Sequence, residues 1–334
     1  MTITRPLIAL LASATLAPAA FAGSFTFGLW GDMPYEKNND AKATAAVIRS
    51  IDRSDVAFSL YDGDIKDGSS ACTDEVFTRN ARTFNAMKAP LVYVPGDNEW
   101  TDCHRKNNGG WNNLERLDTL RKLMFADSRS FGRRKLALEH QDAPFVENTR
   151  FHKGGIEFVQ VNVPGSNNNR VLDEKECSAK SARTAADCEA DNAEYAVRNT
   201  AVNRWIEESF AQARQRKARG LVLTLQADPG FDLPETEELD EAKTRGWNRP
   251  ESGYKDLMDT VIRETQAFDG QVLFVHGDTH VFKHDKPLHA PLNLLPNFTR
   301  LQTFGSPNNH WVHVTVNTRK AGVFTIRPVM VKPD

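Results

Sequence analysis

The sequence predicts a single α/β domain built on a pair of mixed β-sheets. Apolar strand-like runs alternate with amphipathic helical segments as far as His280, and only strand-like runs follow. Four of the runs end in Gly-Asp, and the first three of these aspartates lie 32 and 33 residues apart. Successive strand–helix–strand units take roughly thirty residues each. We therefore expect neighbouring parallel strands that deliver Asp32, Asp64, Asp97 and Asp278 to one edge of a sheet.

Length and composition are those of a soluble globular protein. The chain has 334 residues, of which 40% are apolar and 26% charged. The formal net charge of −2 gives no general attraction for nucleic acid, whose binding proteins usually carry a basic face. We therefore expect no binding of nucleic acid duplexes.

The N-terminal segment has the features of a secretory signal peptide. Arg5 precedes an apolar run from Pro6 to Leu16, and Ala20-Phe21-Ala22 gives the small-x-small pattern of a cleavage site. We expect residues 1–22 to be removed and residues 23–334 to form one secreted or periplasmic domain. The alternative is a retained N-terminal anchor. No later stretch is long and apolar enough to span a membrane.

Four cysteines agree with an oxidising compartment. An even number in an exported chain predicts disulfides. Of the three possible connectivities we favour Cys72–Cys103 and Cys177–Cys188. A zinc site is the alternative, but the spacings do not resemble paired C-x-x-C knuckles.

The expected elements of the first half follow the apolar periodicity. The helix predicted over Asn39–Arg53 places Ala46, Val47 and Ile51 on one face, and Thr73 is a candidate N-cap for the next helix. The predicted elements in this half are the strands Ser24–Trp30, Val56–Tyr61 and Leu91–Val94 and the helices Asn39–Arg53, Thr73–Met87 and Leu114–Phe125.

The second half begins with helices between strands and then turns to strands alone. The longest expected helix, Ala193–Arg216, is predicted to turn Val197, Val202 and Trp205 towards the core, and Asp232–Pro250 is expected to be a surface loop. The other predicted elements are the helix Gly253–Phe268 and the strands Gly155–Val163, Leu221–Leu225, Gln271–His276, Leu301–Phe304, Trp311–Val316 and Gly322–Arg327.

The four Gly-Asp pairs indicate a metal site. A single pair would be read as a turn, since both residues favour turns. Four copies that each close an apolar run are harder to explain in this way. Carboxylates that meet at one sheet edge repel one another unless a cation holds them, and the repetition therefore predicts bound metal.

The order of these motifs resembles that of the calcineurin-like metallophosphoesterase superfamily, whose pattern is D-x-H, G-D, G-N-H-[DE], a lone His and G-H-x-H. The resemblance covers essentially the whole chain after residue 22. It implies a four-layer fold, in which two mixed β-sheets pack as a sandwich flanked by helices. It also implies a two-metal site at the strand ends.

The match is incomplete at individual positions. Asp32 fits the first aspartate, although Pro34 replaces the histidine that follows it, and Asp64 fits the aspartate that bridges both metals. Asp97 replaces the ligand asparagine and Asn98 the catalytic histidine. The remaining positions are Gln226 for the lone histidine, Asp278 for the first histidine of the last motif, and His280, which matches the second.

By this resemblance, one metal would be held by Asp32, Asp64 and His280, and the other by Asp64, Asp97, Asp278 and Gln226. The departures mostly replace imidazole nitrogen by oxygen. Oxygen-rich ligand sets favour Mg²⁺, Mn²⁺ or Ca²⁺ over Zn²⁺. We therefore expect two divalent ions, and we expect them to be Mg²⁺, Mn²⁺ or Ca²⁺ in place of Zn²⁺.

The resemblance implies hydrolysis of phosphate esters by a metal-activated water. Asn98 can donate a hydrogen bond to a phosphate oxygen but cannot protonate a leaving group, and His104 or His276 would have to supply that proton. The leading hypothesis is an exported metal-dependent phosphoesterase of small phosphate esters or nucleotides. The alternative is a non-catalytic relative that binds a metal or another ligand.

Overall fold

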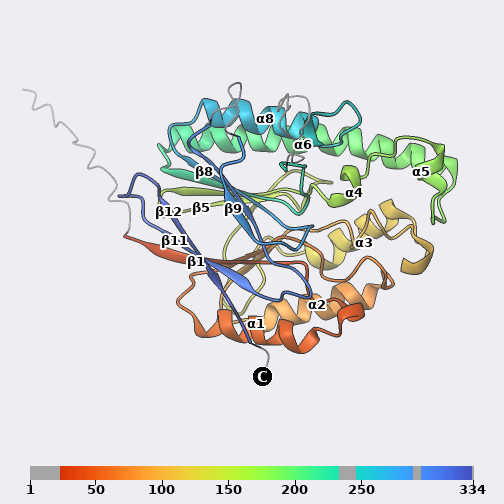
Figure 1. Ribbon diagram of the computed structural model, residues 1–334, viewed down its shortest axis with the longest axis horizontal. Coiled ribbons are helices and arrows are strands. Elements are labelled where there is room, and N and C mark those ends of the chain that lie inside the picture. The colour runs from red at the N-terminus through yellow and green to blue at the C-terminus, as the bar shows by residue number, and fades with distance from the viewer. Residues whose placement is uncertain (1–22, 233–245, 289–294, 333–334) are drawn as a thin grey trace, which may run out of the picture.

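Two mixed β-sheets lie face to face between two layers of helices (Figure 1). This computed structural model describes residues 23–232, 246–288 and 295–332. The four-layer α/β arrangement confirms the predicted fold class. The proposed signal peptide and most of the expected loop at Asp232–Pro250 lie outside the described residues. No helix in the described part of the chain is both long and apolar enough to cross a membrane.

The five-stranded sheet carries three of the Gly-Asp turns. Its central strands run parallel, so that their carboxyl ends share one edge. The order is β12 (Phe324–Val329), β11 (Trp311–Val316), β1 (Phe25–Trp30), β2 (Ser59–Tyr61) and β3 (Leu91–Tyr93), with β11 and β12 antiparallel to their neighbours. The helices on its outer face are α1 (Ala41–Arg53), α2 (Asp74–Ala86) and α3 (Asn113–Met124).

The seven-stranded sheet carries the fourth Gly-Asp turn. Four of its strands, β6, β7, β8 and β10, are parallel, and β4, β5 and β9 pair antiparallel at the two edges. The order is β4 (Glu139–His140), β5 (Thr149–Lys153), β6 (Ile156–Gln160), β7 (Gly220–Thr224), β8 (Gln271–His276), β10 (Phe298–Gln302) and β9 (Lys283–Asp285). Helices α6 (Ala185–Gln215) and α8 (Lys255–Gln266) cover its outer face, and the short helices are α4 (Gly165–Asn168) and α5 (Glu174–Ser178).

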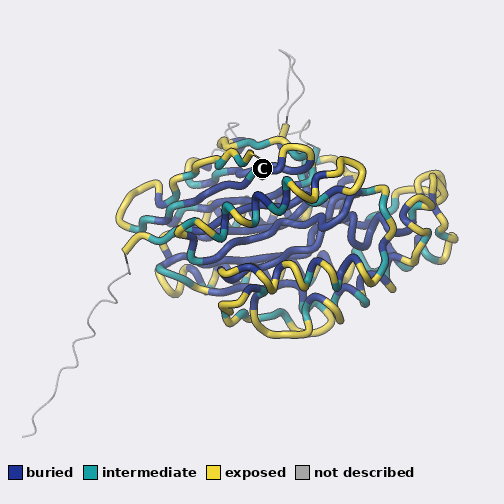
Figure 2. The backbone as a smooth tube through the Cα atoms, turned by 90° about the horizontal axis from the view of Figure 1, so that it is seen from below, coloured by how far each residue is buried: buried dark blue, intermediate teal, exposed yellow. Residues whose placement is uncertain are grey.

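Alternating side chains divide the core into layers. Phe27 and Leu29 of β1 point between the sheets, whereas Trp30 joins the cluster under α1 and α2. The Phe27 ring stacks on Phe58 at a centroid distance of 5.4 Å and meets Phe158 of the other sheet edge-on. Each fully buried aromatic side chain contributes about 1.5–3 kcal/mol to folding. Figure 2 shows the strands buried between more exposed helices.

Both predicted disulfides are confirmed. Cys72 pairs with Cys103, and Cys177 pairs with Cys188. The second bridge joins α5 to the start of α6.

Helix α6 departs from the prediction. It begins at Ala185 instead of Ala193, because Thr184 and Asp187 form a capping box. Val197, predicted to face the core, is 61% exposed, and the next residue, Arg198, takes the buried position. The Arg198 guanidinium donates to the carbonyl oxygens of Asn162 and Asn168. Arginine is polar on any hydrophobicity scale, so the apolar pattern does not predict its burial. The hydrogen bonds offset the free-energy cost of burying the guanidinium group.

The burial of Trp247 also differs from the prediction. The region Asp232–Pro250 was expected to be a surface loop, but Trp247 is 3% exposed and packs in the hydrophobic cluster beneath α6 and α8.

Candidate active site

The four Gly-Asp aspartates lie together where the two sheets meet at the carboxyl ends of their parallel strands. The backbone N–H of Asp278, after β8, is 3.3 Å from both carboxylate oxygens of Asp32, after β1. The Gln226 side-chain amide lies 3.1 Å from Asp97 Oδ1 and 3.3 Å from Asp278 Oδ1. Hydrogen bonds thus join residues from both sheets. All six residues predicted as metal ligands belong to this group.

The glycine of a Gly-Asp pair makes room for a neighbouring carboxylate. A Cβ atom added at Gly96 would lie 2.1 Å from Asp64 Oδ1, and one added at Gly277 would lie 2.2 Å from Asp32 Oδ2. Neither contact is sterically possible. The repeated glycines are therefore required by the close approach of adjacent strand ends and do more than form turns.

The acidic residues themselves adopt a strained backbone. Asp32, Asp64 and Asp278 have φ values of +51°, +62° and +72°, and His280 has +64°. The left-handed region costs a non-glycine residue roughly 1–2 kcal/mol, although aspartate tolerates it better than most residues. Such strain gathers at functional sites, where the surrounding structure has to hold it in place.

Asp64 lies at the centre of the hydrogen-bond network. Its Oδ2 accepts from the Tyr35 hydroxyl at 2.9 Å and from the Asn98 side-chain amide at 2.6 Å, and its Oδ1 accepts from the Asn98 backbone at 3.2 Å. Tyr35 also lies 3.2 Å from His280 Nε2. The other ring nitrogen, Nδ1, is 2.6 Å from the Ser306 carbonyl and must carry a proton to donate there. Nε2 faces the Asp32 carboxylate at 3.5 Å, so the protonated ring can pair with Asp32.

Gln226 lies between Asp97 and Asp278 and contacts both carboxylates. Its Oε1 accepts the backbone N–H of Gly165 at 2.5 Å, which turns its NH₂ group towards the two carboxylates. The glutamine therefore acts here as a hydrogen-bond donor to the acidic residues.

Burial sets the electrostatics of this acidic cluster, which we define as Asp32, Asp62, Asp64, Asp97, Glu99 and Asp278. Burial, assisted by neighbouring carboxylates, raises the pKa of Asp62, Asp64 and Asp278 well above the usual range. Burial likewise raises the pKa of Asp32 and Glu99. Buried Lys66 and partly exposed His280 supply positive charge beside the cluster. A bound cation would favour the ionised forms of these carboxyl groups.

A divalent cation fits this cluster in charge and in donor chemistry. Buried carboxylates are normally paired or bound to metal, and oxygen donors suit Mg²⁺, Mn²⁺ or Ca²⁺. Within the described residues, however, no three His, Cys, Asp or Glu side chains are arranged to hold a metal ion. Tyr35 and Gln226 donate to the oxygens that would be ligands. For a cation to bind, Tyr35 would have to release Asp64, and the Gln226 amide would have to turn its oxygen towards the ion.

The two candidate catalytic residues lie in different surroundings. Asn98 contacts Asp64 directly, as its sequence position predicts. His104 lines a separate cavity of about 330 Å³ with Arg105, Arg170 and Arg183. Burial, together with the charges of Arg183 and Arg105, lowers the pKa of His104 to about 3. The imidazole is neutral near pH 7 and has no proton in excess to give to a leaving group.

His276, the other possible acid, is fully buried, and its ring packs against Phe231 and Phe274. Burial lowers the pKa of His276 to about 4. It too is neutral near pH 7.

Sequence reasoning missed Ser166 as a site residue. Its hydroxyl lies 2.9 Å from Asp97 Oδ2 and 2.7 Å from Asp102 Oδ1. One hydroxyl proton cannot serve both oxygens. Burial, followed by the charge of Asp97, raises the pKa of Asp102 to about 7, so Asp102 can carry the second proton. Ser166 therefore couples the cluster to the cavity beside His104.

Ser166 also begins an unusual backbone segment. Residues 166–169, a serine and three asparagines, all have φ between +49° and +66°. Asparagine is one of the few residues that enter this left-handed region readily. The run of three asparagines was the available sequence signal for this turn.

No family model and no curated protein matches the chain. Several solved structures are similar to this chain at low sequence identity. GAP50, described as the anchor in the inner membrane complex of Plasmodium, has a TM-score of 0.46 and 11% identity, over 93% of this chain and 90% of its own. A 5′-nucleotidase from Candida albicans has a TM-score of 0.42 and 11% identity over 91% of this chain. The sulfate thiohydrolase SoxB from Thermus thermophilus has a TM-score of 0.43 and 14% identity over 86%.

This chain spans 50% of the nucleotidase structure and 42% of the SoxB structure. Likenesses of this degree carry no conclusion about function.

Proposed function

We propose that the chain is an exported, cation-dependent phosphoric ester hydrolase that acts on small phosphate esters or nucleotides. The observation that carries the proposal is the acidic cluster, in which carboxylates from both sheets converge beside Lys66 and His280. The two disulfides agree with an oxidising compartment.

Each part of the cluster has a role in this proposal. Asp32, Asp64 and His280 would hold one cation, and Asp64, Asp97, Asp278 and Gln226 a second. When bound, two such ions would supply an activated water and positive charge for the oxygens of the phosphoryl group. Asn98, whose amide already donates to Asp64 Oδ2, is placed to donate to a phosphate oxygen instead. The strained backbones of Asp32, Asp64 and Asp278 hold the carboxylates close together before substrate arrives.

The test is hydrolysis of a panel of phosphate esters by the purified protein, with Mg²⁺, Mn²⁺ or Ca²⁺ added after treatment with a chelator. We expect activity that returns with the cation and falls at least about 10³-fold in Asp64→Asn, because that position would serve both ions. Asp118→Asn, an exposed substitution on α3, is the matched control. Equal activity of wild type and Asp64→Asn would refute the proposal.

One observation favours a second candidate, a non-catalytic binding protein of the same fold. Tyr35 and Gln226 supply the cluster with hydrogen bonds that need no metal. The two candidates differ in turnover. An enzyme of the proposed kind hydrolyses phosphate esters when Mn²⁺ is bound, whereas the second candidate hydrolyses none of them, whether or not calorimetric titration shows that Mn²⁺ binds.

A further inference from the structure

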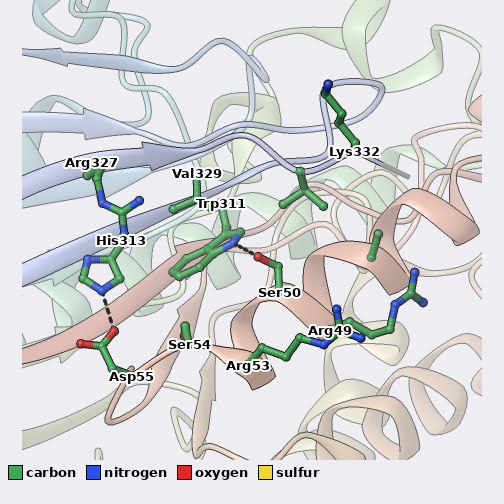
Figure 3. Close-up of a pocket in the computed structure, with 12 residues that line it drawn as sticks. Arg49, Ser50, Arg53, Ser54, Asp55, Trp311, His313, Arg327, Val329 and Lys332 are labelled. Atoms are coloured by element: carbon green, nitrogen blue, oxygen red, sulfur yellow. Dashed lines mark hydrogen bonds and ion pairs between the residues drawn. The ribbon is translucent and has the colours of Figure 1, made fainter. Parts of the chain in front are cut away.

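A basic cavity lies on the outer face of the five-stranded sheet, where α1 meets β11 and β12 (Figure 3). Its volume is about 440 Å³, within the range of small-molecule sites. Helix α1 contributes one wall and the strands the other. The residues used below are Arg49 and Arg53 of α1, Trp311 and His313 of β11, Arg327 of β12, and Lys332, which follows β12.

The cavity concentrates positive charge on a chain whose formal net charge is −2. Four lining residues are arginine or lysine, and Asp55 is the one acidic residue among the lining residues. The Asp55 carboxylate is already held by His313 Nε2 at 3.0 Å. Within the described part of the chain, Arg53, Arg327 and Lys332 form no ion pair.

The cationic side chains lie on two sides of a buried aromatic residue. Arg49 and Arg53 lie one helical turn apart on α1. In Figure 3 the Trp311 indole separates them from Arg327. Trp311 is 2% exposed, and its Nε1 donates to Ser50 Oγ at 3.0 Å, which fixes the floor of the cavity. The guanidinium groups thus stand on a rigid base.

We propose that this cavity binds a small molecule that carries two or more phosphate groups. Guanidinium groups match phosphate oxygens through paired N–H donors. Because cationic side chains come from both walls of the cavity, a ligand with several phosphate groups would offer anionic oxygens to Arg53 of α1 and to Arg327 of β12. Val329 and Val331 also line the cavity and would contact an apolar part of the ligand.

This site is distinct from the acidic cluster. Trp311 packs with Val47 and Ile51 of α1 in the cluster outside the sheet, whereas Asp32 and Asp64 follow the carboxyl ends of β1 and β2. The proposal therefore goes beyond the proposed hydrolase activity and does not depend on it.

The experiment is calorimetric titration of the chelator-treated full protein with pyrophosphate, at low salt and at about 0.15 M salt. We expect saturable binding that weakens as salt rises, because screening reduces the attraction between exposed charges. In Arg53→Gln/Arg327→Gln, binding should weaken at least about tenfold. Arg319→Gln, in the exposed turn between β11 and β12, is the control and should bind as wild type does.

Asp64→Asn separates the two sites. It should retain pyrophosphate binding, and loss of binding in this variant would assign the ligand to the acidic cluster and overturn the proposal. Absence of binding heat in wild type, or equal weakening in Arg319→Gln, would overturn it as well. If the double variant does not fold, Lys332→Gln at the end of the described chain gives the same test with a single substitution.

Discussion

The Tyr35 hydroxyl lies 2.9 Å from Asp64 Oδ2, the oxygen to which the Asn98 amide also donates. Burial raises the pKa of Tyr35 well above 10, so the phenol keeps its proton and remains a donor. The residue that would bridge two cations therefore already accepts three hydrogen bonds. Any cation that binds Asp64 competes with Tyr35.

The first prediction concerns this competition. Tyr35→Phe keeps the ring but removes the donor, and Mn²⁺ should bind about threefold to tenfold more tightly, because one net hydrogen bond of about 0.5–1.5 kcal/mol no longer opposes it. Calorimetric titration of both proteins measures the change. A tenfold weaker affinity in Tyr35→Phe would instead identify the Tyr35 oxygen as a ligand.

The second prediction concerns Gly96. Alanine there would place Cβ 2.1 Å from Asp64 Oδ1, so the carboxylate or the strand end must move. We expect Gly96→Ala to lower the free energy of unfolding by about 1–3 kcal/mol and to impair hydrolysis. Gly322→Ala is the control, since no atom lies within 4 Å of its added Cβ. Urea unfolding compares them, and equal stability would contradict the close approach.

The third prediction concerns the two disulfides. Cys72–Cys103 spans 31 residues and Cys177–Cys188 spans 11, so the chain-entropy relation gives about 3.7 and 2.8 kcal/mol. Replacing both cysteines of the first pair by alanine should therefore destabilise more. Both sulfur atoms of that pair also lie within 3.7 Å of the Asn98 carbonyl. Its loss should reduce hydrolysis too, whereas removal of Cys177–Cys188 should leave kcat unchanged.

The fourth prediction is a pH dependence from His104, whose pKa burial lowers to about 3 from an ordinary value near 6.5. Between these values the unfolded chain binds a proton that the folded protein does not. The contribution of His104 to the free energy of unfolding therefore falls as the pH drops from 6.5 towards 3. His104→Gln should show a shallower fall than wild type in urea titrations at pH 7, 5 and 4. If the free energy of unfolding falls equally with pH in wild type and in His104→Gln, the lowered pKa of His104 is contradicted.

The fifth prediction follows from Asn98. Without a general acid, aryl phosphates and phosphoanhydrides should be hydrolysed about 10²–10⁴ times faster than alkyl phosphates. Asn98→His should narrow this gap. Fast hydrolysis of alkyl phosphates by the wild type would mean that another residue supplies the proton.

Much of the fold was readable from the sequence because its signals are local. Apolar periodicity gave the bounds of β8 and β11 and the positions of α1 and α2. The Gly-Asp pairs predicted which carboxylates would converge. Tyr35 and Ser166 were not identified as hydrogen-bond partners of the cluster, because their roles depend on contacts between residues 29 and 69 positions apart. The burial of Arg198 was not predicted, because the carbonyl oxygens that accept its hydrogen bonds come from residues distant in the sequence.

The left-handed turn at residues 166–169 joins both halves of the sandwich. Ser166 contacts Asp97, which follows β3 of one sheet, while Asn168 accepts hydrogen bonds from Arg198 of α6, which covers the other. Separating the sheets at this edge would break these bonds together. The two halves should consequently open as one cooperative unit, and amide hydrogens of β3 and of α6 around Arg198 should exchange with solvent at matched rates.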